Sequence, residues 1–187
     1  MFFSWAILRV TSAESVDRWT APQLTPALVH LVVGGLFLFR APSVCRADAV
    51  TLAWCLPSFI AGGTAMTLAP ASHLWPILSQ VLFAVGGFGA VIGMLFLGKS
   101  FAVFPAVRTV VANGPYRLIR HPIYLCELVM IAGACLTFSS WTNGLLFAVA
   151  IVTIVIRIVL EEKVLSTSAG YATFSRTVRW RLLPGIW

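Results

Sequence analysis

Charged residues are scarce in this sequence. They make up 10% of its 187 residues, whereas 59% are hydrophobic, and only six side chains are acidic. Soluble domains usually carry about 25% charged residues, so this composition excludes an ordinary water-soluble enzyme. The length suits a single domain. We therefore expect residues 1–187 to form one all-α integral membrane domain.

Cysteine is also rare, and its four copies show no CxxC spacing. At least three of them fall in apolar runs, where disulfides and zinc sites are not expected. The four are Cys45, Cys55, Cys126 and Cys135. We predict that they are reduced, and we expect no metal site.

The N-terminus lacks the features of a signal peptide. Residues 1–10 have no basic start, and Arg9 stands where a cleavage site would need small residues. Residues 11–23 mix charges with Trp19 and suit the headgroup level of a bilayer. We expect both segments to lie at the membrane interface.

Five apolar runs are long enough, or nearly so, to cross a bilayer. They cover about residues 21–39, 49–68, 74–97, 122–138 and 144–160. The connection between the last two is too short to leave the membrane surface, so these runs should form a helical hairpin. Three glycines in the third run would allow a neighbouring helix to approach closely; they are Gly86, Gly89 and Gly93.

Lysine and arginine alternate between the connections. They occur in the first and third loops and in the tail, and are absent from the second and fourth loops. By the positive-inside rule, this pattern predicts an external N-terminus and a cytoplasmic C-terminus, in what we take to be a bacterial inner membrane. The net charge of +7 then favours contact with anionic membrane lipids over nucleic acid.

Residues able to carry chemistry are concentrated between Gly114 and Tyr124, directly before the fourth run. Gly114-Pro115 predicts a turn, and Pro122 suits the first turn of a helix, so His121 should lie at or beside the N-cap. A helix start flanked by arginines attracts anionic groups, although such residues can also be plain caps and lipid anchors. The candidate binding residues here are Tyr116, Arg117, Arg120, His121, Pro122, Tyr124 and Leu125.

Three acidic residues are further candidates. Glu127 is the single acid well inside a predicted span, which marks it as functional unless a partner such as Arg157 explains it. Glu161 and Glu162 end the last run, and adjacent residues on a helix point in different directions. At most one of these two acids should therefore face inward.

Several motifs of the C-terminal half fall in an order known from one family. They are Leu97-Gly98-Lys99-Ser100-Phe101, Gly114-Pro115-Tyr116, Arg120-His121-Pro122-Ile123-Tyr124, Gly133, Glu161-Glu162-Lys163-Val164-Leu165, Tyr171, Phe174 and Arg181-Leu182-Leu183-Pro184. The ordered set, over residues 97–187, resembles the integral membrane methyltransferases that include isoprenylcysteine carboxyl methyltransferase and, more distantly, phospholipid N-methyltransferases. Two departures are Cys126, where the family often has glycine, and a short segment between Leu165 and Tyr171.

The resemblance implies that S-adenosylmethionine binds on the cytoplasmic side, between the last two spans, the preceding loop and a folded tail. Its candidate ligands are the residues given above from Tyr116 to Leu125 together with Glu161 and Glu162. A lipophilic acceptor would enter from the bilayer. The sequence does not indicate an oligomeric state.

We favour a carboxylate of isoprenylcysteine type as the acceptor, because a carboxylate is already a nucleophile at neutral pH. A thiol, an amine or a phospholipid headgroup is the alternative, and Glu127 or His121 would then have to take a proton. Two alternative functions outside methyl transfer are an NADPH-dependent membrane reductase and a non-catalytic lipid-binding protein.

Overall fold

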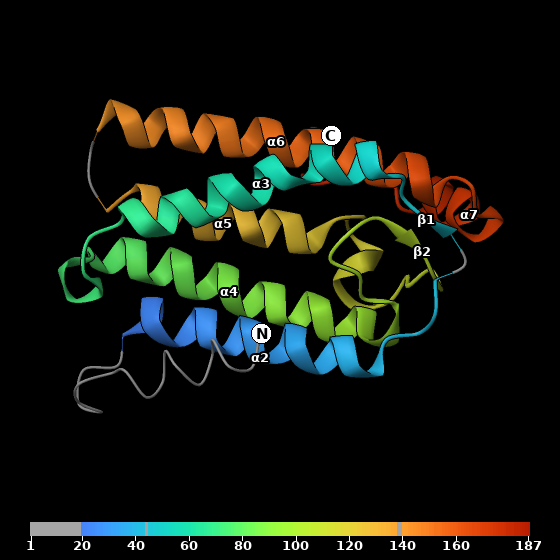
Figure 1. Ribbon diagram of the computed structural model, residues 1–187, viewed down its shortest axis with the longest axis horizontal. Helices are drawn as coiled ribbons and strands as arrows, with labels where there is room; N and C mark the ends of the chain where they lie inside the picture. Colours follow the sequence, from blue (N-terminus) through green and yellow to red (C-terminus); the bar gives the residue numbers. More distant parts are fainter. Residues whose placement is uncertain (1–19, 44, 138–139) are drawn as a thin grey trace.

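The computed structural model describes residues 20–43, 45–137 and 140–187, so the expectations for residues 1–19 lie outside the described part. Its elements, in chain order, are α2 (Ala21–Phe39), β1 (Cys45–Arg46), α3 (Ala49–Leu68), α4 (Ile77–Leu97), β2 (Ala106–Val107), α5 (Pro122–Cys135), α6 (Trp141–Leu165) and α7 (Ala169–Thr177). Short 3₁₀ turns cover Ser72–Leu74, Gly98–Ser100 and Gly114–Arg117. Figure 1 shows the five longer helices lying side by side, with β1, β2 and α7 at one end.

Four of these helices are long and apolar enough to cross a membrane: α2, α3, α4 and α6. The predicted fourth span is shorter than expected, because α5 has only 14 residues, about 21 Å of helix against a hydrocarbon core of about 30 Å. The last span is longer than predicted at both ends. The all-helical membrane architecture is confirmed, with four long spans and one short apolar helix.

The boundaries of the helices follow from local chemistry. The Asp48 carboxylate accepts a hydrogen bond from the Thr51 N–H at the start of α3, and the Ser140 hydroxyl accepts one from the Asn143 N–H at the start of α6. Such caps satisfy donors that the first turn leaves free. Helix α4 begins after Pro76, three residues later than predicted, because Ser72–Leu74 form a separate turn.

Helices α4 and α5 pack most closely, and glycine permits it. A Cβ atom on Gly86 would lie 2.7 Å from the backbone of α5, and one on Gly133 would lie 2.8 Å from the backbone of α4. Gly89 and Gly93 also face α5 at distances too short for a side chain. The predicted close approach is therefore confirmed, and it brings two backbones together over several turns.

The other helices pack around this pair. Helix α2 packs on α4, and α3 packs on α6 and α5. Large apolar side chains such as Ile77, Phe88 and Val152 are more than half exposed on the outer faces, as expected of helices that face lipid. Cys55, Cys126 and Cys135 are free thiols as predicted.

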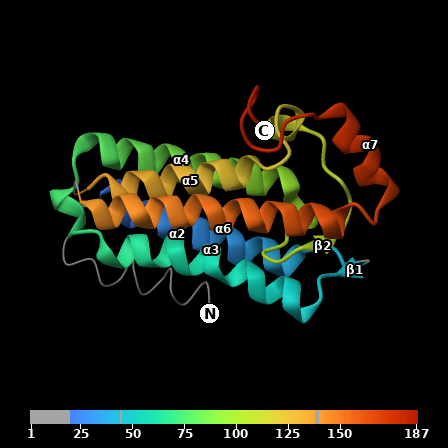
Figure 2. The ribbon, with the colours of Figure 1, turned by 90° about the horizontal axis from the view of Figure 1, so that it is seen from above.

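The long loop before α5 and the tail meet at one end of the bundle, as predicted. The backbone N–H groups of Arg120 and His121 donate to the carbonyls of Trp180 and Arg181, each at 2.9 Å. Figure 2 shows α7 and the C-terminus lying over this end. The sequence did not predict the two-residue antiparallel pair β1–β2, which joins the first loop to the same cap through Cys45↔Val107 and Arg46↔Ala106.

Candidate functional site

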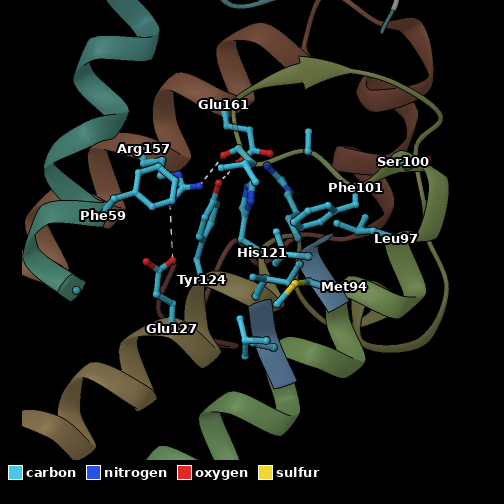
Figure 3. A pocket seen from close by; sticks show the side chains of 18 of the residues that line it. Phe59, Met94, Leu97, Ser100, Phe101, His121, Tyr124, Glu127, Arg157 and Glu161 are labelled. Atoms are coloured by element: carbon cyan, nitrogen blue, oxygen red, sulfur yellow. Dashed lines mark hydrogen bonds and ion pairs between the residues drawn. The ribbon is translucent and has the colours of Figure 1, made fainter. Parts of the chain in front are cut away.

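A cavity of about 420 Å³ opens beneath this cap, within the size range of small-molecule sites. Side chains from five helices, the 98–121 loop and α7 line it. Figure 3 shows its polar part, in which Tyr124 stands between His121 and Arg157, with Glu161 and Glu127 on opposite sides of it. Residues distant in the sequence therefore converge on one chamber.

The local fold around His121 follows the sequence pattern. Gly114 adopts a positive φ of 57° at the predicted turn, His121 is the N-cap of α5 and Pro122 its first residue. The His121 ring stacks on Tyr124 with centroids 5.5 Å apart. Tyr116 is buried and donates to the Gly93 carbonyl at 3.3 Å; burial raises the pKa of its hydroxyl, which therefore stays protonated.

Glu162 holds the cap together. Its Oε1 atom lies 3.0 Å from Arg120 Nη1 and 3.3 Å from His121 Nε2, and its Oε2 atom accepts from Arg181 Nε at 2.7 Å. The Tyr171 hydroxyl donates to the same carboxylate at 3.0 Å. Burial and this neighbouring charge raise the pKa of Tyr171, which keeps its hydroxyl a donor. Glu162 thus ties α6 to α5, α7 and the tail.

Arg120 belongs to the same arrangement. Besides Glu162, its guanidinium donates to the carbonyls of Val178 and Ser175, each at 2.8 Å, and to that of Arg179 at 3.3 Å. Although Arg120 lines the cavity, these bonds use its donors to hold the tail. Its main observed role is to position other groups.

Glu161 has a different environment from Glu162. Glu161 lines the cavity and accepts a hydrogen bond from the Tyr124 hydroxyl, whereas Glu162 does not line it. Of the two adjacent acids, Glu161 therefore faces the cavity and Glu162 faces the cap.

Arg157 is almost fully buried, with 4% of its surface exposed. Its guanidinium lies between two aromatic rings, 4.1 Å from the Phe59 centroid and 4.8 Å from that of Tyr124. It donates to the Val103 carbonyl at 2.8 Å and to the Ser58 hydroxyl at 3.2 Å. Such stacking stabilises a desolvated guanidinium, so Arg157 is a fixed positive charge inside the bundle.

Glu127 projects into the cavity beside Arg157, as the sequence suggested. Its Oε2 atom is 3.8 Å from Arg157 Nη1, an ion-pair distance that is too long for a hydrogen bond. Its side chain is 26% exposed, toward the cavity. Within the described part of the chain Arg157 is its one charged partner, so this carboxylate has room to accept a proton donor.

The remaining predicted residues lie outside the cavity. Arg117 is exposed, Pro122 is buried at the helix start, and Leu125 packs against the core cluster. None of these three lines the cavity. The sequence placed Phe101 in a motif without giving it a role, and it did not single out Phe59; both residues line the cavity.

We expect Glu162→Gln to destabilise the protein more than Glu161→Gln. Removing the charge leaves Arg120 and Arg181 without their carboxylate, and breaking a buried ion pair costs about 3–5 kcal/mol. Thermal unfolding of the purified variants in detergent measures this difference, and trypsin cleavage of the tail should become faster in Glu162→Gln alone. Equal unfolding temperatures for the two variants would contradict the role assigned to Glu162.

Comparison with known proteins adds a family to this geometry. The family model described as phospholipid methyltransferase matches residues 63–171, which include the end of α3, all of α4, α5 and α6, and the loop that lines the cavity. No curated protein matches the sequence significantly. The matched segment is more than half of the chain, so the protein belongs to the phospholipid methyltransferase family, whose members are membrane enzymes that use S-adenosylmethionine.

Proposed function

We propose that this protein methylates the amine headgroup of a membrane lipid with S-adenosylmethionine as the donor. The observation that carries the proposal is the position of Glu127, whose carboxylate faces the cavity and lies 3.8 Å from Arg157 Nη1, too far for a hydrogen bond. An amine must lose a proton before it can attack, and Glu127 is placed to receive it. The description of the matched family, phospholipid methyltransferase, supports a membrane lipid as the acceptor.

The cavity residues fit S-adenosylmethionine. That molecule carries a sulfonium and an ammonium, and the Glu161 carboxylate, which accepts a hydrogen bond from the Tyr124 hydroxyl, lines the polar end of the cavity. No side chain caps the free N–H groups at the start of α5, which favour a carboxylate. The rings of Phe101, Tyr116 and Phe174 line the same chamber and suit a flat base.

These observations support Tyr116, His121, Tyr124 and Glu161 as the residues that would hold S-adenosylmethionine. Arg120 also lines the cavity, but its donors hold Glu162 and the tail, so we propose that it positions the site. Arg117, Pro122, Leu125 and Glu162 have no surface on the cavity, so any effect of theirs on binding would be indirect. This division refines the set suggested by the sequence.

When bound, S-adenosylmethionine supplies the methyl group: the lone pair of the acceptor nitrogen forms the new C–N bond while the S–CH₃ electrons remain on sulfur as a neutral thioether. Glu127 accepts the proton that the amine releases. Arg157 supplies the countercharge that an ionised Glu127 needs inside an apolar bundle. The buried cavity walls exclude water and hold the reacting groups together.

A carboxylate acceptor of isoprenylcysteine type is the second candidate, and Arg157 favours it. A desolvated guanidinium attracts a carboxylate, and an ionised Glu127 would repel one unless it is turned toward a cation. Glu127 does lie beside Arg157. This chemistry would need no proton acceptor, and the two candidates therefore differ in what Glu127 does.

Glu161→Gln should weaken the binding of S-adenosylmethionine by roughly 10- to 150-fold, which corresponds to the loss of one charge-assisted contact of about 1.5–3 kcal/mol. Isothermal titration calorimetry on protein in detergent measures the affinity. Arg117→Ala is the matched control, because its side chain is exposed and does not line the cavity. Unchanged affinity in Glu161→Gln would remove this residue from the binding site.

Glu127→Gln should lower the rate of methyl transfer to an amine lipid by roughly 10²- to 10⁴-fold and leave the affinity for S-adenosylmethionine nearly intact. Transfer of a labelled methyl group to amine, thiol and carboxyl acceptors is measured for wild type and variant. If a carboxylate is the true acceptor, the variant should match or exceed the wild type on it. Equal rates on every accepted substrate would exclude Glu127 from catalysis.

We also propose that the cap faces the cytoplasm. The first loop, the 98–121 loop and the tail, which hold most of the basic residues, meet at one end of the bundle, as the positive-inside rule requires. If α5 crosses the membrane together with the four longer helices, reporter fusions at the two termini should report opposite sides of the membrane. Fusions that report the same side would rule out five crossings.

A further inference from the structure

The cavity continues beyond the polar chamber as an apolar branch. On α5, Tyr124, Glu127, Ile131 and Ala134 line it in succession, at intervals of three and four residues that place them on one helix face. Ten residues of helix extend about 15 Å. The branch therefore follows α5 from the polar chamber toward the opposite end of the bundle.

Two helices that are consecutive in the chain form the sides of this branch. Helix α2 packs on α4, and α3 packs on α6 and α5, and residues of both α2 and α3 line the cavity. In Figure 1, α4 and α5 are visible between α2 and α3. Gly63 of α3 lines the cavity and is also exposed on the surface. The branch thus opens to the lipid side between α2 and α3.

The chemistry of the branch suits a hydrocarbon. Its walls beyond Glu127 are formed by Phe83, Met130, Ile131 and Met66. His30 is a polar residue among them, and its Nδ1 atom lies 2.6 Å from the Pro26 carbonyl of its own helix. A lipid chain could lie here without burying a charge.

Gly62 and Gly63 differ from the glycines that bring α4 and α5 together. A Cβ atom on Gly62 would meet Ile131 at an ordinary 3.6 Å, and one on Gly63 would meet nothing within 4 Å. Glycine is unfavourable inside a helix, and at these two positions close packing does not require it. The effect of the pair is to leave the branch open.

We infer that the pair Gly62 and Gly63 determines which lengths of hydrocarbon chain the enzyme accepts. The chain of the lipid acceptor lies along α5 between α2 and α3 and passes the two glycines, which places its headgroup beside Glu127. This inference rests on the proposed function and adds the residues that set specificity for the acceptor's chain. The bound occupant is a lipid chain because the branch is apolar, open to the bilayer and continuous with the polar chamber.

The first test is Gly63→Leu, which introduces a side chain into open space. We expect transfer to long-chain phosphatidylethanolamine to fall at least about 10-fold in kcat/KM, the scale on which hydrophobic pockets discriminate. Transfer to a short-chain analogue should be retained, and affinity for S-adenosylmethionine should not change. Gly35→Leu is the matched control: Gly35 is also a helical glycine with nothing within 4 Å of its Cβ position, but it does not line the cavity.

The second test does not depend on methyl transfer. A phosphatidylethanolamine with a photoactivatable group in one acyl chain should crosslink to residues 62–66 and to Ile131 in the wild type, and much less in Gly63→Leu. If the lipid crosslinks at these residues but no amine lipid is methylated, the proposed function is wrong and the assignment of the branch to a lipid chain stands. Equal losses on short and long chains, or crosslinks that avoid α3 and α5, would overturn the inference itself.

Discussion

The cap over the cavity depends on the ion pairs that the Glu162 carboxylate makes with the residues around it. This carboxylate binds Arg120 and His121 directly before α5, Tyr171 of α7 and Arg181 of the tail, so two separate stretches of sequence meet at this one group. A negative charge near the C-terminus of a helix is unfavourable. Arg120 and Arg181 offset this cost for Glu162, which lies in the last turn of α6. Without this carboxylate, the guanidinium of Arg120, which also holds the carbonyls of Val178 and Ser175, would lose its countercharge.

Adjacent acidic residues therefore perform different tasks here. Glu162 faces the cap and organises it, and Glu161 faces the cavity beside Tyr124. The same separation appears on α5, where Tyr124 and Glu127 line the cavity while Leu125 packs in the core. Because adjacent residues on a helix point in different directions, one can line the cavity while the next holds the fold together. A sequence motif therefore contains residues of both kinds.

Much of this architecture could be predicted from the sequence. The apolar runs predicted the helices, and the three glycines of α4 predicted that a neighbouring helix approaches it closely without indicating which one. Arg157 was named as a possible partner of Glu127. Helix ends were harder: α6 continues to Leu165, and Arg120 and Arg181 compensate for the charge of Glu162 within its last turns. The contribution of Phe59 could not be predicted, because the packing angle of its helix decides whether it faces the cavity. Phe101 belonged to a motif, but the motif did not indicate its role.

The short length of α5 has a consequence for how the enzyme responds to its membrane. Helices α4 and α6 have 21 and 25 residues, about 32 and 38 Å of helix, and with α3 they pack around the 14-residue α5. The Asn143 side chain donates to the Cys135 carbonyl and satisfies the end of α5 where it stops short. Hydrophobic mismatch with a thicker or thinner bilayer therefore acts first on the longer helices through tilt. It reaches α5, which carries Tyr124 and Glu127, through the close contact of α5 with α4.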